Sequence, residues 1–127
     1  MIKMVLFLMT ALFLPMAVSA NDAVAKSDTN GIFIYENPAN FKAEFDIITP
    51  EPSVISVLVY DAHGNVMFSK RADTQAAGNS NALKVSWNLE NRAGRRVAAG
   101  AYTIQATARS TNGNGIYQYF TQLGVRR

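Results

Sequence analysis

The chain has 127 residues, contains no cysteine and carries a formal net charge of +3 at pH 7. The lack of cysteine excludes disulfide bonds and thiol chemistry. The charge is small and no run of five or six basic residues occurs, which argues against a nucleic-acid partner.

The first 20 residues have the pattern of a secretory signal peptide. Lys3 supplies a positive charge, residues 4–16 form an apolar run, and Val18-Ser19-Ala20 places small or branched residues before a cleavage site. The run is shorter than the roughly 20 residues that span a membrane, so we expect cleavage after Ala20 and no membrane span in the mature chain. Cleavage leaves 107 residues with 11 basic and 9 acidic side chains, enough for one domain.

Residues 21–30 are small and polar, and Val24 is their one strongly apolar member. Such a segment cannot bury enough surface to order itself, so we expect a flexible leader. The remaining residues, 31–127, are predicted to form a single β domain.

From Gly31 onwards, apolar residues recur at every second position, which is typical of strands with one buried face. Short turns separate these segments, and no stretch has the period of a helix. The pattern predicts an all-β antiparallel sandwich of about seven strands with Greek-key connections. The expected strands cover residues 31–35, 41–47, 54–60, 66–70, 83–89, 102–109 and 116–125.

The apolar phase also predicts which faces are buried. Phe41 is expected to share a buried face with Phe45, whereas Glu44 and Asp46 face water. Residues 54–60 are apolar on both faces, which indicates a central or covered strand. Residues 72–82 are polar and are expected to form the longest loop.

Two turns have the same design, with an Asx residue first and a glycine fourth. They are Asp61-Ala62-His63-Gly64 and Asn91-Arg92-Ala93-Gly94. The Asx side chain can accept hydrogen bonds from the turn backbone, and the glycine can adopt a positive φ. Residues 111–115, Thr-Asn-Gly-Asn-Gly, predict a further hairpin turn.

Three segments together resemble a known family: residues 57–66 (VLVYDAHGNV), 85–87 (VSW) and 94–102 (GRRVAAGAY). They are similar to the immunoglobulin-like domain of bacterial flagellar hook-assembly (hook-capping) proteins. In that family Asp-Gly commonly follows the tryptophan, whereas this chain has Asn88-Leu89 at these two positions. Asn37-Pro38-Ala39 also resembles the opening of the related C-terminal sorting domains of type IX secretion cargo. The resemblance covers residues 31–127 and implies an immunoglobulin- or fibronectin III-like sandwich that acts as a scaffold or adaptor.

The sequence offers little for catalysis or metal binding. His63, the only histidine, falls in a predicted turn, and no second ligand type is spaced to join it. A serine triad would need a histidine near a nucleophile, and no Gly-x-Ser-x-Gly motif is present. Five carboxylates lie on solvent-facing sides of strands or near turns and are expected to be solvated: Glu44, Asp46, Asp61, Asp73 and Glu90. We therefore predict no catalytic, cofactor-binding or metal-binding residues and no enzymatic activity.

The aromatic residues leave one alternative open. Trp87 alternates in phase with Leu83, Val85 and Leu89, which predicts a core position. Tyr117 and Tyr119 share one face of the last strand. If that face is the outer one, they form an exposed stripe beside Tyr35 or Tyr60, of the kind that marks a partner surface.

These features predict an exported, non-enzymatic structural or interaction module that binds a protein or a cell-envelope component. Its expected location is the periplasm, the cell surface or the medium, and an unpaired edge strand could accept an added strand. Two alternatives from other classes are a type IX-like secretion sorting domain and a carbohydrate-binding module.

Overall fold

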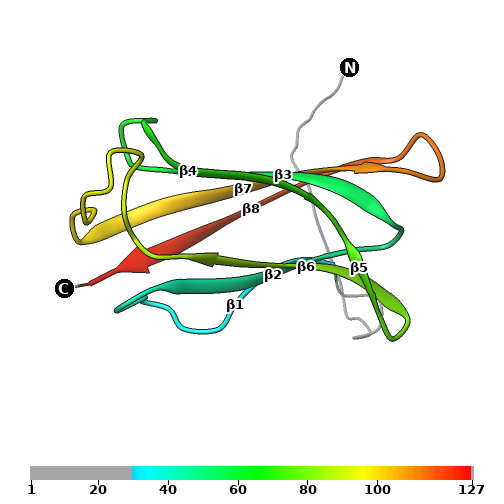
Figure 1. The fold of residues 1–127 in the computed structure, drawn as a ribbon, viewed down its shortest axis with the longest axis horizontal. Helices are drawn as coiled ribbons and strands as arrows, with labels where there is room; N and C mark the ends of the chain where they lie inside the picture. Colours follow the sequence, from blue (N-terminus) through cyan, green and yellow to red (C-terminus); the bar gives the residue numbers. More distant parts are fainter. Residues whose placement is uncertain (1–29, 127) are drawn as a thin grey trace, which may run out of the picture.

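The computed structural model describes residues 30–126, which form a two-layered β-sandwich (Figure 1). The predicted signal peptide, residues 1–20, lies outside the described residues, and so does the predicted leader, residues 21–30, apart from Asn30. No helix long and apolar enough to cross a membrane occurs among residues 30–126.

Within this range eight strands form two four-stranded sheets, and every strand pairing is antiparallel. One sheet has the order β1-β2-β6-β5, made of β1 (Gly31–Ile34), β2 (Ala43–Thr49), β6 (Ser80–Trp87) and β5 (Gln75–Ala77). The other has the order β4-β3-β7-β8, made of β4 (Val66–Asp73), β3 (Ser53–Tyr60), β7 (Gly100–Ser110) and β8 (Ile116–Val125). The predicted all-β sandwich is confirmed, and residues 54–60 lie in a central strand as expected.

The core lies between the two sheets, where alternate residues of each strand meet. Trp87 is 1% exposed, as predicted, and its ring packs against Tyr102 at 5.9 Å and Phe68 at 6.1 Å between centroids. The Trp87 indole N–H donates to the carbonyl oxygen of Glu90 at 2.8 Å, so its polar atom is satisfied in the core. The other large buried side chains include Phe45, Ile47, Ile55, Leu89, Ile104 and Leu123. Each contributes roughly 1.5–3 kcal/mol through burial.

Both Asx-glycine turns form as predicted. The Asp61 carboxylate accepts from the backbone N–H groups two and four residues later, both at 2.9 Å. Asn91 does the same at 2.9 and 3.0 Å. Gly64 and Gly94 have φ values of 88° and 81°, which a residue with a β-carbon rarely adopts.

The predicted loop over residues 72–82 is wrong, because it contains strands. β4 ends at Asp73, Thr74 follows, and β5 begins at Gln75, so one bent segment passes from the sheet that contains β3 to the sheet that contains β6 (Figure 1). The Thr74 N–H donates to the Ser53 carbonyl at 2.9 Å, and the Thr74 hydroxyl accepts from the Ser53 N–H at 3.0 Å. This pairing uses backbone groups and the Thr74 hydroxyl and needs no apolar side chains, so the polar composition did not indicate it.

The predicted burial of Phe41 is also wrong: its side chain is 80% exposed, and β2 begins only at Ala43. The chain turns before β2 and places Ala39 beside the end of β8. The Ala39 N–H donates to the Gly124 carbonyl at 2.7 Å, and the Ala39 carbonyl accepts from the Arg126 N–H at 3.0 Å. Phe41 therefore belongs to a turn, outside the alternation of β2.

Candidate functional site

Exposed large apolar side chains of the described sandwich occur at two strand edges, one in each sheet. They lie on the edge strands β1 and β8 or in the segment after β1: Phe33, Tyr35, Phe41, Ile116 and Phe120. The opposite edge strand β4 instead carries the charged residues Lys70, Arg71 and Asp73. Exposed aromatic residues such as Phe33 and Tyr35, two residues apart at the end of β1, are of the kind that marks an interaction surface.

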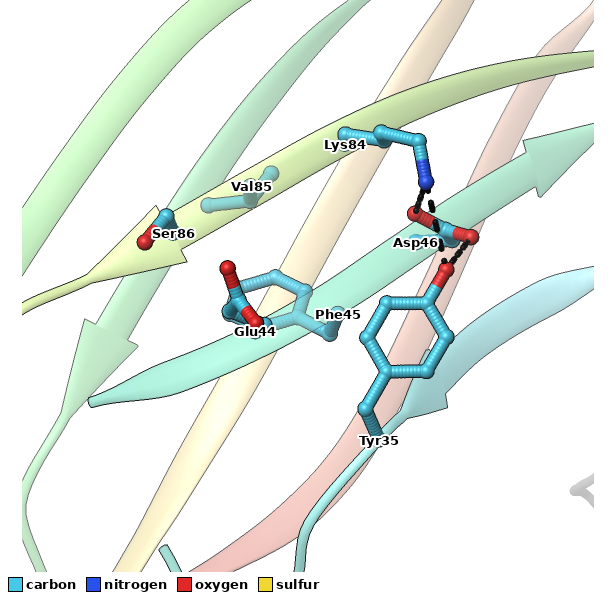
Figure 2. Close-up of a pocket in the computed structure, with 7 residues that line it drawn as sticks. All are labelled: Tyr35, Glu44, Phe45, Asp46, Lys84, Val85 and Ser86. Carbon is cyan, nitrogen blue, oxygen red and sulfur yellow. Dashed lines mark hydrogen bonds and ion pairs between the residues drawn. The ribbon is translucent and has the colours of Figure 1, made fainter. Parts of the chain in front are cut away.

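A shallow pocket of about 190 Å³ opens on the outer face of the sheet that contains β1, β2 and β6 (Figure 2). Its central side chains come from three places: Tyr35 follows β1, Asp46 lies in β2, and Lys84 lies in β6. Strand register brings them together, because Asp46 pairs with Lys84 on one side and with Phe33 on the other. Glu44, Phe45, Val85 and Ser86 complete the lining.

Tyr35, Asp46 and Lys84 form a hydrogen-bonded cluster. The Tyr35 hydroxyl donates to Asp46 Oδ2, and Lys84 Nζ donates to the Tyr35 hydroxyl oxygen at 3.4 Å. Lys84 Nζ also lies 3.6 Å from Asp46 Oδ1 and 5.6 Å from the centre of the Tyr35 ring. Figure 2 shows the Tyr35 ring reaching across β2, with its hydroxyl beside the carboxylate and the ammonium group.

These contacts shift the pKa values of Tyr35 and Lys84. The pKa of Tyr35 is raised, first because its hydroxyl donates to Asp46. The pKa of Lys84 is also raised, first by its hydrogen bond to Tyr35 and then by the charge of Asp46. A nucleophilic lysine needs a lowered pKa, so the cluster presents a neutral ring and a lasting positive charge, which suit binding to an acceptor group.

The structure corrects the expectation that Asp46 is fully solvated. Its side chain is 18% exposed, and Oδ1 is buried without a hydrogen-bond partner in the part of the chain that the structure describes. The ammonium of Lys84 provides partial compensation. Tyr35 covers Asp46 from the segment that follows β1, and only the register between β1 and β2 could have indicated this. Glu44 is exposed, as expected.

The exposed stripe of Tyr117 and Tyr119 is not formed. Both side chains are partly buried and pack against the core, and Ile116 and Phe120 occupy the outer face instead. The Tyr117 hydroxyl donates to Glu51, a carboxylate that also accepts from the Ser110 hydroxyl at 2.8 Å. These two tyrosines therefore offer no platform for a sugar ring. The Glu51 cluster was not expected, because it joins residues at distant places in the sequence.

His63 lies exposed in its turn, as expected, beside a pocket of about 210 Å³ that residues 98–102 complete. Asp61 faces this pocket, but its carboxylate is engaged in the turn. The pKa of Asp61 is lowered, first by the hydrogen bond from the backbone N–H of Asn65. Across residues 30–126, no three histidine, aspartate or glutamate side chains are grouped so that they could hold a metal ion. Asp73 and Glu90 are exposed.

The two packed antiparallel sheets and the Asx-glycine turns define an immunoglobulin-like β-sandwich. The model of the FlgD Ig-like domain matches residues 35–112, and the chain belongs to this family. No curated protein matches the sequence.

Two solved structures are similar to the chain. Dimeric latent PorU from Porphyromonas gingivalis matches 85% of this chain with a TM-score of 0.61 and 20% identity. PorZ, described as an essential surface component of the type IX secretion system of the same organism, matches 76% with a TM-score of 0.47 and 19% identity. The chain spans only 10% of the PorU chain and 12% of the PorZ chain. The PorU match supports the fold.

Proposed function

We propose that the chain is an exported, non-enzymatic module that binds a protein or cell-envelope partner through the surface around β1. This β1 surface consists of Phe33, Tyr35, Phe41, Asp46 and Lys84. The observation that carries the proposal is the exposed Tyr35 ring beside the Lys84 ammonium group, with Phe33 opposite Asp46 in the strand register.

The chemistry of the β1 surface fits a protein partner. Aromatic side chains bury a large area while few rotamers are lost, and they are enriched at interfaces. Lys84 can donate to a carboxylate or a carbonyl oxygen of the partner. The raised pKa of Lys84 supports binding over covalent chemistry.

Photo-cross-linking in the native host tests this function. A photoreactive residue at Phe41 or at Tyr35 should yield a cross-linked adduct with an envelope protein, identified by mass spectrometry. The control position is Ser69, which is exposed on β4 at the opposite edge. Equal adducts from all three positions, or none, would contradict the proposal.

Export is the second part of the proposal. It is supported by the signal pattern of residues 1–20 and places the module in the periplasm, at the cell surface or in the medium. The mature protein purified from cell fractions should begin at Asn21. An N-terminus that still contains Lys3 would show that no signal peptidase cleaves the chain.

A second candidate is a type IX-like sorting signal, which the resemblance of Asn37-Pro38-Ala39 to the opening of such domains supports. Residues 31–127 fused to a secreted reporter should then carry the reporter to the surface of a host with that machinery. A reporter retained in the periplasm would remove this candidate and leave the binding module in place.

A further inference from the structure

One half of the β8 edge is covered by the chain itself. Asn37 Nδ2 donates to the Gln122 carbonyl at 3.2 Å, and Asn37 Oδ1 accepts from the Gly124 N–H at 2.8 Å. The Ala39 N–H donates to the Gly124 carbonyl at 2.7 Å. These bonds show that the even-numbered residues of β8 direct their backbone groups away from β7.

The other half of this edge is open. By the same alternation, Ile116, Gln118 and Phe120 direct their N–H and C=O groups away from β7. Among the described residues, none forms a hydrogen bond with these outward backbone groups. The hairpin that joins β7 to β8 projects beyond the rest of the sandwich (Figure 1), and the side chains of Ile116, Gln118 and Phe120 are exposed. We call Ile116 to Phe120 the open β8 edge.

The open β8 edge lacks the features that normally prevent pairing between sheet edges. β8 contains no charged residue and no proline over its ten residues. The opposite edge strand β4 carries Lys70, Arg71 and Asp73, and charged side chains on an edge discourage pairing. Of the two outer strands in this sheet, β8 is therefore the one suited to accept another strand.

The sequence of the open β8 edge is self-complementary. It reads Ile-Tyr-Gln-Tyr-Phe, which has the same order of side-chain types in both directions. An antiparallel copy centred on Gln118 sets Ile116 opposite Phe120 of the second copy. It also sets Tyr117 opposite Tyr119 on the inner face, and the two Gln118 amides opposite each other.

We propose that the open β8 edge pairs with the same edge of a second copy of this chain, which joins two sandwiches through one continuous sheet. The arrangement is isologous, because each copy contributes the same residues about a two-fold axis. The pairing satisfies the outward backbone groups of Ile116, Gln118 and Phe120. It also covers the apolar side chains of Ile116 and Phe120, while the β1 surface stays exposed.

The symmetry of the sequence favours a second copy over an unrelated peptide, since an unrelated peptide would not require it. Asn37 limits the pairing at one end of the open edge, and the hairpin turn limits it at the other. The contact is short compared with the interface of a permanent dimer. We therefore expect a reversible dimer whose population rises with concentration.

Sedimentation velocity of the exported protein over a range of concentrations tests the proposal. Gln118→Pro removes the outward N–H of Gln118 without removing a backbone hydrogen bond to β7, although the 3.5 Å side-chain bond from Gln118 Nε2 to the Thr107 hydroxyl is lost. The variant should raise the dimer dissociation constant by about tenfold or more. Ser69→Pro is the matched control, because the register places the Ser69 N–H outward on the β4 edge. A wild-type protein that stays monomeric, or an equal effect of both prolines, would overturn the proposal.

Cross-linking provides a second test that does not depend on tolerance of proline. The chain has no cysteine, so Gln118→Cys introduces a single thiol. Across the two-fold axis the paired Cα atoms would lie about 5.5 Å apart, within reach of a disulfide or a short thiol cross-linker. Gln118→Cys should give covalent dimers much faster than Ser69→Cys under the same oxidation. Equal rates would show random collision and overturn the proposal, whereas the binding role of the β1 surface would be unaffected.

Discussion

The side chain of Asn37 forms hydrogen bonds with the backbone of β8 on both sides of Leu123: its Oδ1 accepts from the Gly124 N–H at 2.8 Å and its Nδ2 donates to the Gln122 carbonyl at 3.2 Å. The segment lies so close that a β-carbon added at Gly124 would be 3.3 Å from Asn37 Oδ1 and from Pro38 Cβ. In this way, a residue near the start of the domain closes the edge of its last strand.

Asn37→Ala should therefore destabilise the domain. The substitution removes both side-chain hydrogen bonds to β8, each of which contributes about 0.5–1.5 kcal/mol. We expect the free energy of unfolding in urea to fall by roughly 1–2 kcal/mol. Asn112→Ala is a suitable control, because Asn112 lies in the exposed hairpin turn. A stability equal to that of the wild type would show that the edge contact contributes nothing.

The two Asx-glycine turns predict a specific sensitivity to β-branched residues. Gly64→Val and Gly94→Val should each destabilise the fold by about 1–3 kcal/mol, because valine rarely adopts a positive φ. Space is not the limit, since a β-carbon at either glycine would meet no atom within 4 Å. Gly113→Ala is the matched control, because Gly113 has no positive φ and an added β-carbon would have comparable room. Thermal unfolding of the three variants distinguishes backbone strain from a general sensitivity of turns to substitution.

Leu89 has a φ of 63° and a fully buried side chain. Leu89→Gly should relieve a backbone strain of roughly 1–2 kcal/mol. It should also lose about 2–5 kcal/mol of core packing, as large-to-small substitutions do. The expected result is a net loss of stability in urea unfolding. A variant as stable as the wild type would mean that the relieved backbone strain fully offsets the lost packing.

Burial raises the pKa of Tyr119 to about 12. The unfolded chain releases this proton near pH 10, whereas the folded chain retains it to higher pH. The contribution of Tyr119 to stability is thus fully present below pH 10 and is lost as the pH rises towards 12. Urea midpoints measured from pH 8 to pH 11.5 should fall less steeply in Tyr119→Phe than in the wild type. Identical slopes would show that Tyr119 ionises equally in both states.

The sequence predicted those parts of the fold that depend on side-chain periodicity and turn chemistry. The alternation around Trp87 correctly indicated a core strand, and the Asx-glycine spacing correctly indicated two turns. β5 was missed because its pairing uses backbone groups of polar residues. Phe41 was misplaced because its phase continued that of β2 across a turn.

The candidate site was beyond the reach of sequence periodicity. Tyr35, Asp46 and Lys84 meet only because β1, β2 and β6 pair in a particular register. The sequence of each separate segment does not indicate that register. The orientation of Tyr117 and Tyr119 was also left open, since both faces of β8 carry large side chains. The packing of β8 in its sheet places Tyr117 and Tyr119 against the core.

The bent segment from Val66 to Ala77 has a consequence for how the domain opens. It is hydrogen bonded to β3 in one layer and to β6 in the other, so the layers cannot separate while both of these pairings remain. The interior of the molecule should therefore melt as one cooperative unit, in which slowly exchanging amides of β2 and of β7 become labile together.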